Sequence, residues 1–239
     1  MKIVKTSWLI VAAVASSFSS MAQTADEVIN KHIEAIGGKE KLSAITSVKM
    51  ERTLQIMGND APATTIILNG KGYRNESEFG GQKMVEVITD KGGWAINPMM
   101  GSADPQPMAD AQYQAGKGQL YAVPLLNYQA RGEKASLLGQ EKVGDANTYK
   151  IQLTDNSNQS TTYFIDASSY YIVQTVKTAD MMGQSMDLTT TYSGFKKTDY
   201  GWVVAENIEM SFGGQFSLTG KTTKTEINSP VDAAIFQMK

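Results

Sequence analysis

An alternation of apolar and polar residues begins at Val48 and constrains the fold more than any other feature. From Val48 to Ile56 most even-numbered positions are apolar and the odd-numbered positions before Ile56 are polar, as in a strand with one buried face. Turn-forming groups such as Gly80-Gly81 and Asp90-Lys-Gly-Gly93 punctuate the chain. Many strands joined by short turns indicate an antiparallel meander in one domain. A less perfect alternation recurs in segments 64–69, 84–89, 149–153, 161–165, 170–176, 185–192, 202–212 and 215–225.

The segment before these strands has helical periodicity instead. Thr24 and Glu27 have the spacing of a capping box, and apolar residues recur at helical intervals from Ala25 to Ile36. Gly37-Gly38 supplies a helix stop, and residues 39–44 predict one further short helical turn. We therefore expect an N-terminal helix with one apolar stripe to bury.

The first 22 residues read as a cleaved secretory signal peptide. Lys2 and Lys5 precede an apolar run from Trp8 to Ala15, and small residues lead to Ser20-Met21-Ala22. The run is shorter than the roughly 20 residues of a membrane-spanning helix. We expect cleavage after Ala22, a mature domain of residues 23–239, and a soluble periplasmic protein; an uncleaved anchor is the alternative.

Residues 98–134 depart from the strand pattern. The segment is rich in Pro, Gly, Gln, Ala and Met, and two short helices are predicted at Met108–Ala115 and Gly118–Tyr128. An insertion of this length in a compact domain is usually functional. We interpret it as a lid, with a mobile surface excursion as the alternative.

The chain carries little of the chemistry that enzymes need. It has no cysteine and a single histidine, His32, so thiol catalysis, a histidine-based triad and a two-histidine zinc motif are excluded. Glu76 and Glu78 share a strand face, but spacing alone does not identify a catalytic pair. Without Lys2 and Lys5, the 22 basic residues fall to 20 against 24 acidic ones, with no basic run to bind nucleic acid. We expect a protein that is not an enzyme and needs no metal or cofactor.

Two charged residues fall on apolar faces. Arg52 is in register with Val48 and Leu54, and Glu206 is in register with Trp202 and Met210, so both are predicted to point inward. A buried charge must be paired or hydrogen-bonded. Each residue is interpreted as a functional latch, a structural ion pair, or a group at the rim; an unseen bulge would reverse the inference.

Methionine is the other unusual feature, with clusters at Met99-Met100 and Met181-Met182 and single residues at Met108 and Met186. Flexible thioether side chains suit surfaces that repack around varied apolar ligands. We favour a ligand-binding role over plain core filling.

Three segments carry a resemblance to a known family. They are Val87-Ile-Thr-Asp90-Lys-Gly-Gly-Trp94-Ala-Ile-Asn97-Pro98, Tyr163-Phe-Ile-Asp166 continuing to Phe195, and Val231-Asp-Ala-Ala-Ile-Phe236. In this order they resemble the LolA family of periplasmic lipoprotein carriers, in the form found in outer-membrane lipoprotein-sorting proteins of the Bacteroidetes type. The similarity spans most of the mature chain.

The resemblance implies a mainly β (α+β) fold, a single antiparallel unclosed β-barrel of about eleven strands. An N-terminal helix and short lid helices would cover an apolar cavity that admits acyl chains. The family's latch arginine aligns near Lys71–Arg74, but the family's Arg-Pro pair is missing here, so Arg52 and Arg74 remain competing candidates. The candidate cavity and lid residues are Met50, Arg52, Leu54, Arg74, Trp94, Met99, Met100, Met108, Leu120, Tyr121, Leu125, Met186 and Met210.

Three functions are weighed. The first is a periplasmic carrier of acylated lipoproteins or other lipids toward the outer membrane, with an inner-membrane exporter, an outer-membrane receptor and only transient membrane contact. The second is an envelope assembly module whose β-shell holds a partner protein's hydrophobic segment. The third, a lipid hydrolase, is disfavoured because no activated nucleophile is available.

Overall fold

The computed structural model describes residues 23–181 and 184–238. The predicted signal peptide, residues 1–22, lies outside the described residues. The helical elements are α1 (Ala25–Ala35), α2 (Lys39–Ser43), η1 (Pro98–Met100), α3 (Asp110–Gly116), η2 (Lys117–Leu120), η3 (Tyr128–Arg131) and η4 (Ala233–Phe236). The strands are β1 (Ser47–Ile56), β2 (Asn59–Leu68), β3 (Gly72–Phe79), β4 (Gln82–Thr89), β5 (Gly93–Asn97), β6 (Ser102–Pro107), β7 (Lys134–Val143), β8 (Ala146–Thr154), β9 (Ser160–Asp166), β10 (Ile172–Met181), β11 (Gln184–Lys197), β12 (Val203–Phe212) and β13 (Phe216–Ile227).

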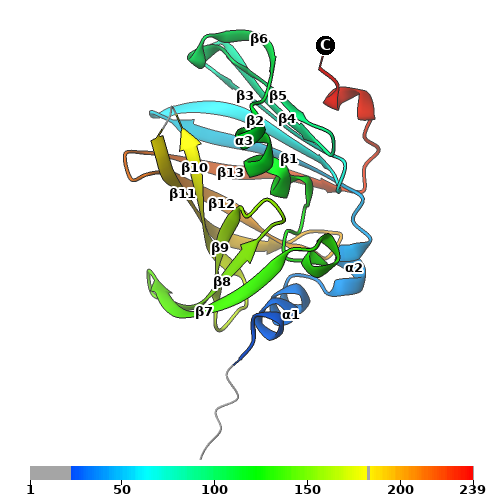
Figure 1. The fold of residues 1–239 in the computed structure, drawn as a ribbon, viewed down its shortest axis with the longest axis vertical. Helices are drawn as coiled ribbons and strands as arrows, with labels where there is room; N and C mark the ends of the chain where they lie inside the picture. Colours follow the sequence, from blue (N-terminus) through cyan, green and yellow to red (C-terminus); the bar gives the residue numbers. More distant parts are fainter. Residues whose placement is uncertain (1–22, 182–183, 239) are drawn as a thin grey trace, which may run out of the picture.

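All these strands form one antiparallel sheet with the order β6-β5-β4-β3-β2-β1-β13-β12-β11-β10-β9-β8-β7. Its two halves meet where β1 pairs with β13. The edge strands β6 and β7 do not pair with each other, so the sheet is not closed. It curves around α3, which lies on the concave side (Figure 1). The mainly β fold, the antiparallel meander and the unclosed sheet are confirmed.

The strand number differs from the expected one. The structure has thirteen strands rather than about eleven. β6 lies inside the segment that we interpreted as a lid, and its Pro105 and Pro107 disguise it, because proline is typical of edge strands rather than central ones.

The N-terminal helix matches its prediction. The Thr24 hydroxyl accepts from the Glu27 amide (3.2 Å), and the Glu27 carboxylate accepts from the Thr24 amide (3.0 Å), which completes the capping box. The Gly38 amide donates to the Ile33 carbonyl where the helix ends. α2 follows at once, as expected.

One end of the curved sheet, here called the near end, is filled by the main hydrophobic core. Apolar residues of α1 and α2 pack there against the sheet and against the segment 123–128. Val28 of α1 and the sheet residues Ile151 and Ile165 are fully buried in this core. At the opposite end, here called the far end, lie the turns Met57–Gly58, Gly80–Gly81 and Gly213–Gly214. No helix of the described residues has both the length and the apolarity needed to cross a bilayer.

The segment 98–134 is only partly as predicted. α3 replaces the first predicted helix with similar bounds, but the second predicted helix, Gly118–Tyr128, is wrong. The 3-10 turns η2 and η3 stand at its ends, and the chain between them is irregular around Pro124. Proline disfavours helical backbone in the residue before it, which explains the interruption.

Candidate functional site

The concave side of the sheet, here called the inner face, is identified by α3. A Cβ added to Gly116 of α3 would lie 2.2 Å from the Cδ1 atom of Ile88 on β4, so Ile88 points toward the helix. Cross-strand partners share a face, which extends the assignment from strand to strand. Glu86 lies two residues before Ile88 and therefore on the same face of β4. Asn75 pairs with Glu86, and Thr65 pairs with Asn75, so all three residues lie on the inner face.

The inner face has three layers along the strands. The near-end layer belongs to the hydrophobic core. A polar belt crosses the middle, and an apolar layer follows toward the far end. The polar belt consists of Arg52, Thr65, Asn75, Thr175, Tyr192 and Thr222. The far-end apolar layer consists of Leu54, Leu188, Ile208, Met210, Phe212 and Leu218.

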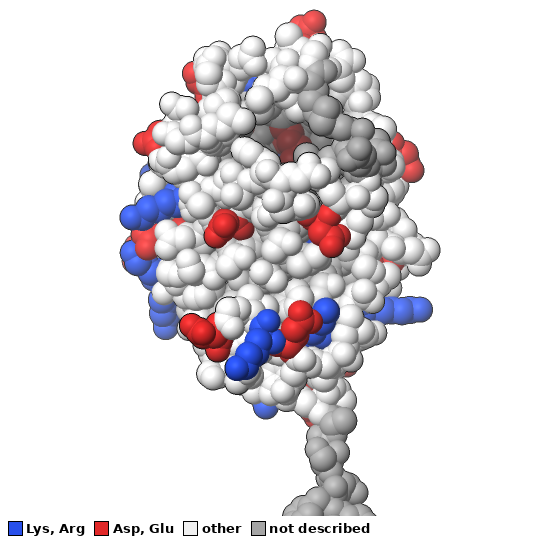
Figure 2. Space-filling view, turned by 90° about the vertical axis from the view of Figure 1, so that its left-hand side faces the viewer, with Lys and Arg blue, Asp and Glu red and all other residues white. Residues whose placement is uncertain are grey.

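The far-end apolar layer is not packed into a hydrophobic core of the described residues. Its six side chains are half-buried and belong to neither hydrophobic core cluster of the described residues. Gly220 between Leu54 and Ile208 leaves room for both, because a Cβ there would lie 2.8 Å from Leu54 Cδ2. Figure 2 views the molecule from the side of the far-end turns and shows a hollow in this surface, with acidic atoms at its base.

Arg52 organises the polar belt. Its Nη1 atom donates to the Thr65 hydroxyl (2.9 Å) and its Nε atom to the Thr222 hydroxyl (3.3 Å). The Thr65 hydroxyl in turn donates to the Asn75 side-chain oxygen (2.9 Å), and Arg52 Nη2 contacts the Met50 sulfur (2.8 Å). Burial lowers the pKa of Arg52. The prediction that Arg52 points inward is confirmed.

Glu86 and Lys177 add two more buried charges to the inner face. Burial raises the pKa of the Glu86 carboxyl, and the nearby Lys177 ammonium opposes that shift. Burial likewise lowers the pKa of Lys177, against the influence of Glu86 and Asp155. The two groups approach each other without an ion pair within 4.0 Å in the described residues.

Lys177 is also one of the residues that hold α3 against the sheet. Its ammonium donates to the Ala115 carbonyl, and the Tyr113 hydroxyl of the same helix donates to the Thr89 carbonyl (3.1 Å). Neither Arg52 nor Arg74, the two candidate latches, has a hydrogen bond to segment 98–134 in the described residues. A lysine on an alternating strand gives no sequence signal for this role.

Arg131 fixes the irregular part of the same segment. It donates to the Leu126 carbonyl (2.7 Å), to the Pro124 carbonyl and to both carboxylate oxygens of Glu133 (2.8 and 2.7 Å). Its guanidinium lies 4.2 Å from the centre of the Tyr121 ring, a cation–π contact. Sequence reasoning missed this group; the only hint was an arginine two residues before a glutamate.

A cleft of about 180 Å³ lies between this segment and the inner face of β8, β9 and β10. Leu120, Tyr121 and Arg131 line one side of it, and Tyr163 and Lys177 line the other. Two predicted lid residues, Leu120 and Tyr121, therefore border a real cleft. Within the described residues, no group of three His, Cys, Asp or Glu side chains could hold a metal ion.

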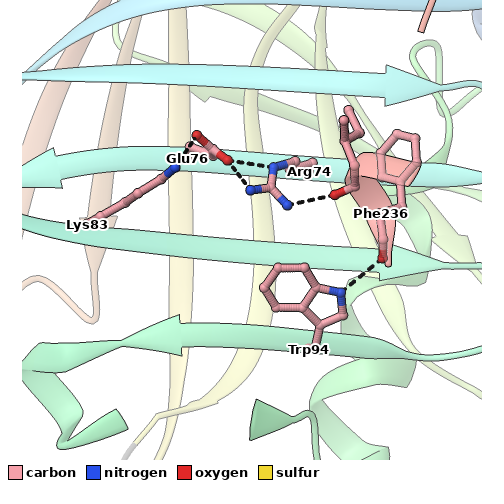
Figure 3. A network of polar contacts seen from close by, with 6 residues as sticks. Arg74, Glu76, Lys83, Trp94 and Phe236 are labelled. Atoms are coloured by element: carbon pink, nitrogen blue, oxygen red, sulfur yellow. Dashed lines mark hydrogen bonds and ion pairs between the residues drawn. The ribbon is translucent and has the colours of Figure 1, made fainter. Parts of the chain in front are cut away.

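Arg74 and Trp94 are not cavity residues, which corrects the prediction. They lie on the outer face under η4, where Arg74 Nη1 donates to the Ile235 carbonyl (2.7 Å) and Trp94 Nε1 donates to the Phe236 carbonyl (2.9 Å). Arg74 also pairs with Glu76, which binds Lys83 at 2.9 Å (Figure 3). The strand register places both residues on one face, because Arg74 and Trp94 each pair with Val87, and the contacts with the C-terminal segment identify this face as the outer one.

The remaining predicted residues are spread over the molecule. Met50, Leu54, Met186 and Met210 lie on the inner face, and Leu125 is buried in the main core. Met108 packs against Gly93, and Met99 is 63 % exposed in η1. The side chains of Met100 and Met181, and all of Met182, lie outside the described part of the chain.

Glu206 does not point into the cavity, contrary to the prediction. Its carboxylate pairs with Lys196 (2.8 Å) and Lys221 (4.0 Å), whose side chains are largely exposed. Gly194, opposite Glu206 in the strand register, has φ +66°, a left-handed conformation that breaks the pleat locally. Of the three interpretations of Glu206, the structural ion pair is the one that the structure supports.

Comparisons with known proteins give the fold and no closer relationship. No family model and no curated protein matches the sequence. A LolA superfamily protein from Nitrosomonas europaea matches with a TM-score of 0.59 at 15% identity, covering 90% of this chain and 98% of the other. An outer membrane lipoprotein-sorting protein domain from Vibrio parahaemolyticus matches with a TM-score of 0.55 at 12% identity, covering 89% and 97%. A DUF1329 family protein from Desulfovibrio piger matches with a TM-score of 0.52 at 8% identity, covering 89% of this chain and 97% of the other. The structural match to LolA superfamily proteins predicted from the sequence is therefore confirmed.

Proposed function

We propose that this protein is a non-enzymatic periplasmic carrier that holds acyl chains of lipoproteins or other lipids and transfers them toward the outer membrane. The observation that carries the proposal is the far-end apolar layer. Its half-buried side chains take no part in either core cluster of the described residues, although burying them would be favourable, and we propose that they line the hollow of Figure 2. The fold shared with lipoprotein-sorting domains supports the same function.

Burial of acyl chains supplies the binding energy. Each methylene group removed from water contributes about 0.8 kcal/mol, so a few methylenes against this layer give useful affinity. The candidate residues Met50, Leu54, Met186 and Met210 lie on the face where such a chain would pack. We propose that α3 and the segment up to Arg131 form the lid.

Neighbouring residues of β12 provide a matched test. Met210 lies in the far-end apolar layer, and Ser211, the next residue, lies on the outer face. Met210→Asp should abolish binding of a fluorescent fatty acid, because it places a charge where the chain packs, and Ser211→Asp should leave binding unchanged. If the two variants bind the fatty acid equally well, and circular dichroism shows that both are folded, the inner face is not the ligand site.

A second candidate function is an envelope module that holds a partner protein's hydrophobic segment. It is favoured by apolar side chains exposed at the far-end turns, Met57 at 77 % and Phe216 at 37 %. Native mass spectrometry of protein purified from its own periplasm separates the two: acylated species favour the carrier, and a bound polypeptide favours the module.

N-terminal sequencing of that material tests cleavage after Ala22, which predicts a first residue of Gln23.

A further inference from the structure

Within the part of the chain that the structure describes, Arg52 differs from the other two arginines in having no carboxylate partner. Arg74 pairs with Glu76 and Arg131 pairs with Glu133. Within the described residues, Arg52 meets only two threonine hydroxyls and the Met50 sulfur. A thioether is a weak acceptor, so one edge of the guanidinium has no strong acceptor.

Such an arrangement is costly without a counter-charge. Buried guanidinium groups normally face a carboxylate or phosphate, because removing the charge from water costs several kcal/mol. The groups that influence Arg52 are the hydroxyls of Tyr73 and Tyr192, which are neutral at physiological pH. The buried carboxylate of Glu86 interacts electrostatically with the Lys177 ammonium instead. Among the described residues, Arg52 is therefore a buried positive charge that has no carboxylate within ion-pair distance.

The position of Arg52 gives a ligand access to it. The side chain lies deep in the shell, yet it keeps accessible surface, as expected of a group that lines a hollow. The far-end apolar layer begins directly beyond it, with Leu54 on the same strand face. From Arg52 to Ile56, where β1 ends, the strand spans about 13 Å at roughly 3.3 Å per residue, a length that suits much of an extended alkyl chain.

We propose that Arg52 binds the anionic headgroup of an amphiphile, a carboxylate or a phosphate, which enters head-first and lays its alkyl chain along the far-end apolar layer. This proposal rests on the carrier function above and specifies its ligand. Arg52 offers a planar fork of donors that matches either anion. Thr65, Thr222 and Met50 hold that fork in place.

The test compares headgroups at constant chain length on the mature protein. Dodecanoate, dodecyl phosphate, dodecanol and dodecyltrimethylammonium are titrated below their micelle concentrations, with binding followed by calorimetry. Either anion should bind about tenfold to one-hundredfold more tightly than dodecanol, as expected for a charge-assisted hydrogen bond. The tighter of the two anions identifies the headgroup.

Variants assign the effect to Arg52. Arg52→Met should lose the preference for the anion while it keeps the affinity for dodecanol, and Arg52→Lys should keep part of the preference. Arg74→Met, on the outer face, is the matched control and should bind like the wild type. A latch role for Arg52 predicts the opposite sign, since its removal would raise affinity for the anion.

The outcomes distinguish this proposal from the carrier function. Wild-type protein that binds none of the four compounds contradicts the carrier function itself. Equal binding of the anions and dodecanol, or an anion preference that survives in Arg52→Met, overturns the Arg52 site alone. The wild-type headgroup series needs no variant, so a poorly folding Arg52→Met leaves the proposal testable.

Discussion

Lys177 of β10 donates a hydrogen bond from its ammonium group to the main-chain carbonyl of Ala115 in α3. The donor comes from the sheet and the acceptor from the last turn of a helix on its concave side. A cation near a helix C-terminus is also favoured by the helix dipole. This contact joins the proposed lid to the wall of the proposed cavity.

Lys177→Met should loosen α3. A charge-assisted hydrogen bond contributes about 1.5–3 kcal/mol, so amide exchange in residues 110–116 should accelerate at least about tenfold, as measured by hydrogen–deuterium exchange. Lys196→Met, which removes an exposed ion pair with Glu206, is the control and should leave this segment unchanged. Unaltered exchange in Lys177→Met would mean that other contacts hold the helix.

Gly116→Ala should destabilise the protein, although alanine normally favours helices. The new Cβ would lie 2.2 Å from Ile88 Cδ1, and Ile88 is fully buried, so its methyl group has no space to move into. Overpacking of this kind lowers the free energy of unfolding, as measured by urea titration, by about 1–3 kcal/mol. Gly118→Ala meets nothing within 4 Å and serves as the control. A neutral Gly116→Ala would show that α3 shifts away from β4 at little cost.

Arg131→Met should lower the free energy of unfolding by about 2–4 kcal/mol, because it leaves the Glu133 carboxylate without its partner. The side chains of this pair are only 15% and 11% exposed. Arg131→Lys should recover little, since an ammonium group cannot replace the two-pronged contact. The control is Glu141→Gln, which breaks an exposed pair with Lys150 and should cost less than about 1 kcal/mol. If Arg131→Met and Glu141→Gln lower the free energy of unfolding by similar amounts, the buried Arg131–Glu133 pair is not an important source of stability.

His32 should make stability depend on pH. It is buried, its Nδ1 atom lies 2.8 Å from the Tyr170 carbonyl, and burial lowers its pKa to about 4. The unfolded chain, with a histidine pKa near 6.5, binds the proton more readily, so stability is full above pH 6.5 and falls as the pH drops toward 4. The loss amounts to about 3 kcal/mol for a shift of this size.

The variant His32→Gln isolates this contribution. His32 is the only histidine of the chain, so the difference in unfolding free energy between wild type and variant should change between pH 6.5 and 4 and be flat above pH 7. A constant difference across the whole range would show that His32 titrates normally in the folded protein.

Much of the scaffold was predictable because local rules set it. The capping box at Thr24, the glycine stop at Gly38 and the alternation from Val48 each reflect interactions between residues close in sequence. The strands β6 and β7 were not expected, although each pairs with a neighbouring strand, β5 or β8, because proline or glycine obscures their alternation. The irregular stretch before η3 depends on Arg131, whose contacts no local pattern reveals.

The sequence by itself determined which residues share a face of a regularly pleated strand, because side chains alternate with a period of two, and it failed at Glu206, which lies opposite Gly194. It placed Arg52 on the same strand face as Val48 and Leu54. Only the tertiary structure decided which face is concave. η4 covers the face of Arg74 and Trp94, and α3 lies against the face of Ile88. That choice rests on contacts between segments far apart in the chain, and it places Arg52 on the concave face, where the described residues give its charge no carboxylate partner.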